Sequence, residues 1–163
     1  MKNIFPKAVN PPKLVKPYAP VLGYLAAGMS ALFAIVHMFR IDTFLPIVDR
    51  VLPGSSTSAG WFVVTVILAE VFALPFLLRM KLSPLAHIVS GFLGILAPLM
   101  WTLLSIWTLG TSPSTGQLGE FVSLPSSALL VTGNLAWLAL VFTTLWTLGY
   151  NNLKVKDITS PRR

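Results

Sequence analysis

One carboxylate in the middle of a long apolar stretch is the side chain in this sequence best placed to do chemistry. Glu70 is the single acid of residues 59–80, AGWFVVTVILAEVFALPFLLRM. A bilayer core about 30 Å thick is crossed by about 20 apolar residues in a helix, which places Glu70 near half depth. An ionised carboxylate is costly there, so we predict that Glu70 faces protein or water. It then either takes part in function or only joins two helices through a hydrogen bond.

Three further side chains are candidates for a ligand site with Glu70. Counting residues from the ends of the predicted spans puts Asn134 at a membrane depth within about one helical turn of Glu70. Its amide is therefore the expected partner of the carboxylate. His37 lies in the last turn of the first apolar segment, near the outer surface, where it either forms an interfacial hydrogen bond or contacts a quinone. Trp101 lies toward the outer end of its segment, where aromatic side chains gather. We predict one ligand-binding groove near Glu70, Asn134, His37, Trp101, Trp61 and Trp107.

Composition shows which elements must position these residues. The 163-residue chain is 55% hydrophobic and 10% charged, with a mean hydropathy of +0.77, which lies outside the range of soluble domains. Four apolar segments of helical length follow one another, at residues 18–39, 59–80, 84–109 and 126–150. We therefore predict an all-α, polytopic membrane protein with four transmembrane helices in an antiparallel bundle. Residues 18–150 form this domain, between an N-terminal arm (1–17) and a C-terminal tail (151–163).

The connection between the first two spans predicts a short amphipathic helix. In FRIDTFLPIVDRVLPG the apolar residues recur at helical spacing while two acids share the opposite side, a pattern carried by Phe44, Ile47, Val48, Val51, Asp42 and Asp49. The segment is too short to cross the bilayer, so we expect it in the outer interface. Between the second and third spans, RMKLSP predicts a tight turn with Ser83 as helix cap and Pro84 in the first helical position.

The distribution of cations predicts the orientation. Ten Lys and Arg residues fall in the N-terminal arm, the turn at residues 79–81 and the C-terminal tail, which all lie on one side of the predicted bundle. On the other side, Arg40 and Arg50 are balanced by Asp42 and Asp49. Because cationic loops stay in the cytoplasm, we expect a multi-pass protein of the bacterial plasma (inner) membrane with both termini cytoplasmic.

Several function classes are disfavoured by what the sequence lacks. The absence of cysteine removes disulfides, thiolate metal sites and thiol nucleophiles. No metal site and no catalytic residue are expected, because no P-loop, dinucleotide fingerprint or zinc motif is present. His37 and His87 fall at opposite membrane faces, so they do not ligate one haem. The pI near 10.2 reflects contact with the lipid bilayer, not nucleic-acid binding.

The outer connection at residues 110–127 contains one acid, Glu120, with Gln117 and Phe121 near it. Its Gly, Ser and Pro content is typical of a solvated loop. Its length also leaves room for a lid or a partner-binding segment.

These features resemble the DoxX and MauE group of small bacterial membrane proteins. The resemblance covers roughly residues 20–150 and depends on the four spans, the short helix after the first, Gly60 at the start of the second, and AEVFALPFLLR at 69–79. Glu70 matches the glutamate that the group carries in its second span. The resemblance implies an accessory membrane subunit linked to quinone-coupled sulfur oxidation, to maturation of a periplasmic dehydrogenase or to chaperoning of membrane proteins.

The expected function is therefore an integral membrane accessory subunit that contacts quinone or lipid and is coupled to a redox protein or another membrane subunit. If the chain has enzymatic activity, it is the membrane subunit of a quinone-linked oxidoreductase. No cofactor is expected, although the site leaves room for a quinone. Two alternatives stay open: a small-molecule or ion carrier that works as a homo-oligomer, since one acid makes no continuous relay, and an assembly factor or chaperone.

Overall fold

The computed structural model describes residues 10–11, 13–52, 56–109, 117 and 128–150 and contains five α-helices in these ranges. The helices are α1 (Ala19–Phe39), α2 (Ile41–Val51), α3 (Ser56–Leu77), α4 (Pro84–Trp107) and α5 (Ala128–Thr147). All but α2 are long and apolar enough to cross a membrane. The predicted all-α bundle with four candidate membrane spans and one short helix is confirmed.

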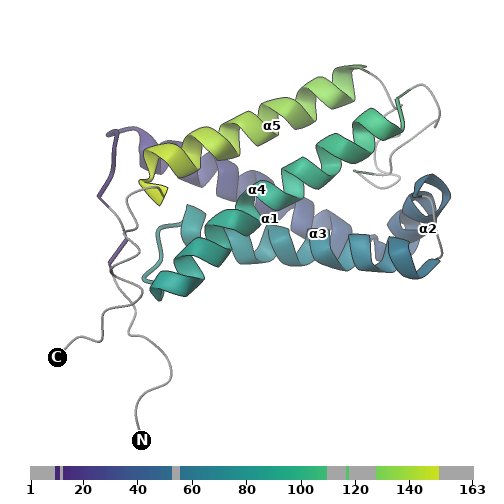
Figure 1. Cartoon of the computed structure of the whole chain (residues 1–163), viewed down its shortest axis with the longest axis horizontal. Coiled ribbons are helices and arrows are strands. Elements are labelled where there is room, and N and C mark those ends of the chain that lie inside the picture. The colour runs from purple at the N-terminus through teal and green to yellow at the C-terminus, as the bar shows by residue number, and fades with distance from the viewer. Residues whose placement is uncertain (1–9, 12, 53–55, 110–116, 118–127, 151–163) are drawn as a thin grey trace, which may run out of the picture.

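The four long helices form an antiparallel bundle in which α1 and α4 both contact α3 and α5. Helix α2 lies across one end of the bundle and packs mainly on α3 (Figure 1). At the opposite end, the Val15 backbone N–H donates to the Thr147 carbonyl at 3.0 Å, so the segment before α1 meets the end of α5. The two described ends of the chain therefore lie together, away from α2.

Small residues let α1 approach α3 closely. Gly23, Ala26, Ala27, Ser30 and Ala34 recur at four-residue spacings and are all buried. A Cβ added to Gly23 would lie 2.7 Å from the backbone oxygen of Leu77 on α3. Membrane helices gain little from hydrophobicity, so such close backbone contact is a main source of their association.

The turn between α3 and α4 follows the predicted capping chemistry. The Ser83 hydroxyl accepts a hydrogen bond from the Ala86 backbone N–H at 3.2 Å, and Pro84 begins α4. Arg79, with φ of 56°, adopts the left-handed conformation that commonly ends a helix. The turn thereby fixes α3 and α4 as an antiparallel pair.

A serine of α4 repairs the backbone of α3 beside a proline. Pro75 lacks an N–H and interrupts the hydrogen-bond ladder of α3. The Ser90 hydroxyl donates to the Phe72 carbonyl at 2.6 Å and accepts from the Phe76 N–H at 3.1 Å. Unpaired backbone groups are costly in a membrane, so this contact stabilises α3 where the proline weakens it.

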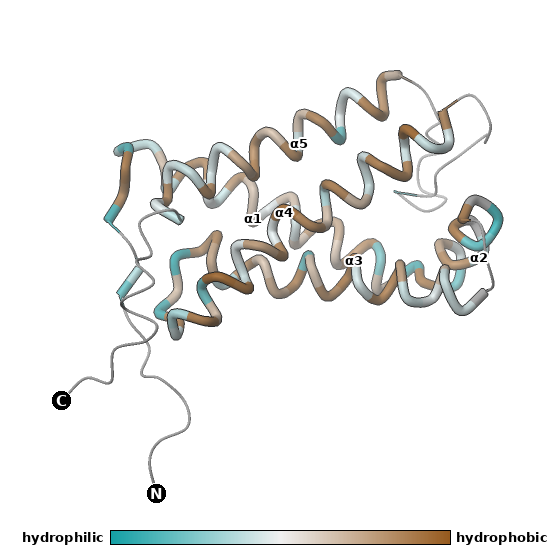
Figure 2. Tube along the Cα trace, viewed as in Figure 1, coloured by the Kyte–Doolittle hydropathy of each residue, from teal (hydrophilic) through white to brown (hydrophobic). Residues whose placement is uncertain are grey.

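Helix α2 is amphipathic, as the sequence predicts. Phe44 and Val48 are completely buried, whereas Asp42 and Asp49 are exposed. The side chains of Ile47 and Val51 lie outside the described part of the structure. The long helices differ from α2 in being apolar along most of their length (Figure 2), and large apolar side chains such as Leu32 and Leu103 are exposed on their outer faces. Such outer faces suit hydrocarbon as solvent.

Candidate functional site

A histidine and a glutamate from two antiparallel helices meet inside the bundle. His37 Nδ1 on α1 lies 2.9 Å from Glu70 Oε2 on α3, and the side chains are 1% and 0% exposed. Helical side chains tilt toward the N-terminus of their own helix. Because α1 and α3 run in opposite directions, His37 leans into the bundle and Glu70 leans toward the α2 end. The two groups therefore meet although their positions along the helices differ.

The second ring nitrogen of His37 determines how protons are held at this pair. His37 Nε2 lies 3.0 Å from the backbone carbonyl oxygen of Gln117. A carbonyl only accepts hydrogen bonds, so Nε2 carries a hydrogen. The contact between Nδ1 and Oε2 then holds one further proton, on either the carboxyl group or the imidazole. In both forms the His37–Glu70 pair has no net charge, which suits a site of low dielectric.

Aromatic rings enclose His37. The Phe44 and Trp101 rings lie nearly parallel to the imidazole, with centroids at 4.9 and 5.1 Å, and Phe33 stacks at 6.0 Å. Phe44 comes from α2 and Trp101 from α4, so four helices contribute to one cluster. This enclosure excludes water from the His37–Glu70 pair and strengthens the interaction between them.

Two polar atoms in the cluster have no hydrogen-bond partner among the residues that the structure describes. These atoms are Glu70 Oε1 and Trp101 Nε1, and both are buried. The Trp101 ring stacks on His37, which holds the other carboxylate oxygen of Glu70, so the two atoms belong to one packed cluster. Unsatisfied buried polar atoms are rare in folded proteins and typically mark strain or a functional site. The cluster therefore offers one free acceptor and one free donor near each other.

A second polar cluster lies between α4 and α5. Asn134 Nδ2 donates to Ser105 Oγ at 2.7 Å and to Gln117 Oε1 at 3.0 Å. Gln117 Nε2 donates in return to Asn134 Oδ1 at 2.7 Å. Because the Gln117 carbonyl also accepts from His37, this one residue joins the two clusters.

The structure brings the four predicted site residues into one region but corrects two of their contacts. Asn134 is not the partner of Glu70: its amide is occupied by Gln117 and Ser105, and its longest contact, at 3.5 Å, is to the Trp101 carbonyl. His37 lies in the last turn of α1, as predicted, but its side chain is buried and bonds Glu70 instead of an interfacial group. The distance along the helix axis alone is therefore not enough to predict which side chains meet.

The two other tryptophans of the predicted groove do not join the cluster. Trp61 is 69% and Trp107 65% exposed, whereas Trp101 is fully buried. Three residues that contact His37 were missed as site residues, namely Phe33, Phe44 and Gln117. Phe44 was detectable as the apolar face of α2, but no signal in the sequence indicates that Gln117 enters the bundle. Glu120 and Phe121 lie outside the described residues.

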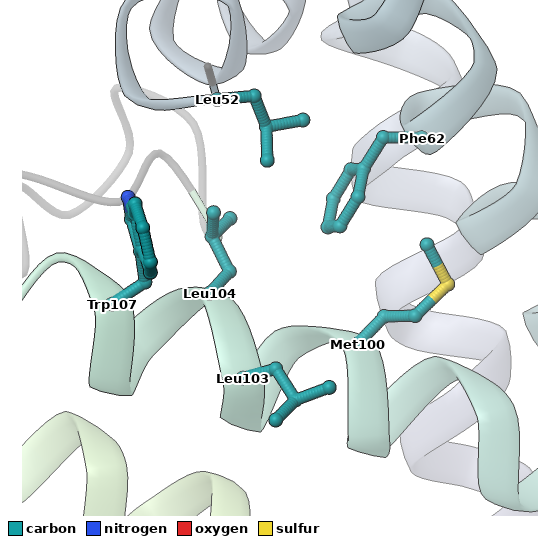
Figure 3. Close-up of a pocket in the computed structure, with 6 residues that line it drawn as sticks. All are labelled: Leu52, Phe62, Met100, Leu103, Leu104 and Trp107. Carbon is teal, nitrogen blue, oxygen red and sulfur yellow. The ribbon is translucent and has the colours of Figure 1, made fainter.

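An apolar groove opens beside this cluster. It has a volume of about 410 Å³ and is lined by Leu52, Phe62, Met100, Leu103, Leu104 and Trp107 (Figure 3). Phe62 and Met100 point toward each other across it. The edge of the Phe62 ring contacts Trp101 at a centroid distance of 6.0 Å. Trp101 therefore separates the groove from the His37–Glu70 pair.

The other histidine lies apart from this site. His87 is in the first turn of α4, at the end of the bundle opposite α2, and its ring packs edge-on against Phe76 at 5.4 Å. Among the described residues, no group of three or more His, Asp or Glu side chains could hold a metal ion.

Comparisons with protein-family models, with curated proteins and with solved structures find no match for this chain. The case for a function therefore depends on the geometry of the site itself.

Proposed function

We propose that this chain is a non-catalytic accessory subunit of the bacterial plasma membrane that contacts a quinone at the His37–Glu70 pair and works with a redox partner protein. The observation that carries the proposal is the buried pair, which shares one proton and leaves Glu70 Oε1 without a partner. Such an arrangement is chemically suited to exchanging a hydrogen bond or a proton with a neutral molecule that arrives through the membrane.

The donors and acceptors present fit a quinone head group. A quinone oxygen accepts hydrogen bonds, and Trp101 Nε1 is a buried donor without a partner. A quinol hydroxyl donates, and Glu70 Oε1 is a buried acceptor without a partner. When bound, a quinone supplies two-electron, two-proton carrier chemistry. This chain contributes the hydrogen bonds and a place for one of the two protons, while the second proton and both electrons come from or go to the partner.

The arrangement of charge supports cytoplasmic termini. The exposed or half-buried cations Lys13, Lys16, Arg79 and Lys81 lie at the end of the bundle away from α2, without described acids among them. At the α2 end, Arg40 and Arg50 are accompanied by two acids. The positive-inside rule therefore favours an α2 that faces the outer side of the membrane.

The resemblance to the DoxX and MauE group is a second support for the accessory role. It rests on the order of the spans and on Glu70, the same residue that carries the site. The histidine partner of Glu70 adds a chemical reason for a carboxylate at that depth, because the pair is neutral as a unit.

The test is the quinone content of the purified protein. Wild-type protein, Glu70→Gln, His37→Gln and the control Asp49→Asn, which changes an exposed acid, are purified from quinone-replete membranes and extracted for chromatography. We expect quinone with wild type and Asp49→Asn, and a loss of about tenfold in affinity with Glu70→Gln, as for one lost charge-assisted hydrogen bond.

Two results would contradict this proposal. One is a wild-type protein that neither retains quinone nor binds it when it is added back. The other is a folded Glu70→Gln variant, judged by its thermal unfolding, that binds quinone as well as wild type; the pair would then serve only to join α1 and α3.

A further inference from the structure

We infer that the groove between α2, α3 and α4 binds the hydrocarbon tail of the quinone, with the quinone head at Trp101. This inference rests on the proposed function and adds to it the position of the tail. The groove lies at the outer ends of α3 and α4, within segments of membrane-spanning length. Whatever fills it must therefore come from the bilayer.

The lining of the groove selects a neutral molecule. All six lining residues are uncharged, and five of them are aliphatic or phenyl side chains. A charged head group would be costly to bring to this depth. A phospholipid, whose charged head stays at the surface, can thus lay a chain here but cannot reach Trp101 with its head. A single-tailed molecule with a neutral head can do both.

The position of Trp101 connects the groove with the unpaired polar atoms. One neighbour of its ring is Phe62, which lines the groove, and another is His37, which holds Glu70. Its own Nε1 is buried and unpartnered. A head group that reaches Trp101 from the groove therefore lies on the other side of this indole from His37, which holds Glu70.

Shape must give the groove its selectivity. Lipid chains are as apolar as the lining, so a tail gains little from hydrophobicity when it leaves the bilayer for the groove. It gains from close packing against fixed walls and from being tethered to a bound head. The volume of about 410 Å³ is in the lower part of the range of about 300–1,000 Å³ typical of small-molecule sites.

The test compares a long-chain alkylquinone with the same quinone head lacking the tail. Dissociation constants are measured by equilibrium dialysis against protein in nanodiscs, for wild type, Leu103→Trp in the groove and Leu32→Trp on the outer face of α1. Leu32 is a matched control for Leu103, since each side chain is 59% exposed. For each quinone, the dissociation constant of the variant is divided by that of the wild type. Partitioning of the quinone into the nanodisc cancels in this ratio.

We expect Leu103→Trp to weaken the binding of the long-chain quinone by about tenfold, equal to about 1.4 kcal/mol. The binding of the tail-less quinone should be unchanged. Leu32→Trp should change neither. Equal weakening of both quinones by Leu103→Trp, or no weakening of either, would overturn the groove assignment and leave the proposed function standing. A wild-type protein that binds neither quinone would overturn the proposed function itself.

A second measurement does not depend on any substitution. A long-chain quinone with a photoreactive group at the end of its tail is irradiated with wild-type protein, and the labelled peptides are identified by mass spectrometry. Labelling within residues 99–107 supports the groove. Labelling confined to the outer face of α1 or α5, far from Met100 and Phe62, contradicts it.

Discussion

The His37–Glu70 contact is the feature on which the site depends at the scale of single residues. Each partner satisfies the other, and both are almost completely buried. Removing one therefore leaves the other buried and unpaired, whereas removing both leaves no member of the pair and takes from the Gln117 carbonyl its His37 donor. The pair should behave as one unit in a stability measurement.

A double-mutant cycle tests this behaviour. We expect Glu70→Leu and His37→Leu each to lower the free energy of unfolding, and the double variant to be less destabilised than the sum, with a coupling of about 0.5–2 kcal/mol. Asn134→Leu should couple more weakly to Glu70→Leu, because the amide does not contact the pair directly and reaches it through Gln117 and Trp101. Unfolding is followed in detergent by circular dichroism. Strict additivity for His37 and Glu70 would contradict the observed contact.

At the scale of elements, α2 is part of the site through one side chain. Phe44 is fully buried, stacks on His37 and packs at a tilt against Trp101. The helix therefore closes the α2 end of the bundle above the pair. Its separation from the other helices would open the aromatic enclosure of His37.

Truncating this side chain measures how strongly α2 is held. Phe44→Ala should destabilise the protein by about 3 kcal/mol, as for other buried phenylalanines, and should increase the accessibility of His37 to a histidine-modifying reagent. Ile41→Ala, on an exposed position of the same helix, is the control and should have little effect. Equal reactivity of His37 in both variants would show that α2 does not cover it.

The α1–α3 contact makes a separate prediction. Gly23→Ala places a Cβ 2.7 Å from a backbone oxygen of α3, so the helices must move apart at a cost of about 1–3 kcal/mol. Gly28→Ala meets no atom within 4 Å and should be neutral or slightly stabilising, since alanine favours helix. Both are compared by thermal unfolding. A Gly23→Ala variant as stable as Gly28→Ala would mean that α1 and α3 pack more loosely than described.

For the whole molecule, orientation is the property that the proposed function requires. The chain has no cysteine, so single cysteines can be introduced without removing any. We expect Asp49→Cys, next to the end of α2, to react in intact cells with a membrane-impermeant maleimide. Lys81→Cys, in the turn between α3 and α4, should react only after the cells are opened. The reverse pattern would place α2 in the cytoplasm and contradict the proposed orientation.

The sequence predicted the architecture well because its signals are local. Apolar runs of spanning length, the amphipathic pattern around Phe44 and the Ser83 cap are each set by nearby residues. The partner of Glu70 was predicted wrongly because it depends on side-chain direction and on a loop residue from another part of the chain. Counting residues along the helix axes omits the tilt of the side chains. This tilt brings His37 into contact with Glu70, while Asn134 bonds Gln117 instead.

The single proton shared by His37 and Glu70 has a consequence for how the membrane voltage acts on this protein. An electrically neutral pair experiences no net force in the transmembrane field, so its resting state is insensitive to voltage. Adding or removing one proton creates a unit charge inside the field, and moving such a charge across the full membrane involves about 2.3 kcal/mol per 100 mV. The free energy of proton exchange at this site would therefore depend on the membrane voltage, in proportion to the fraction of the field that the proton crosses.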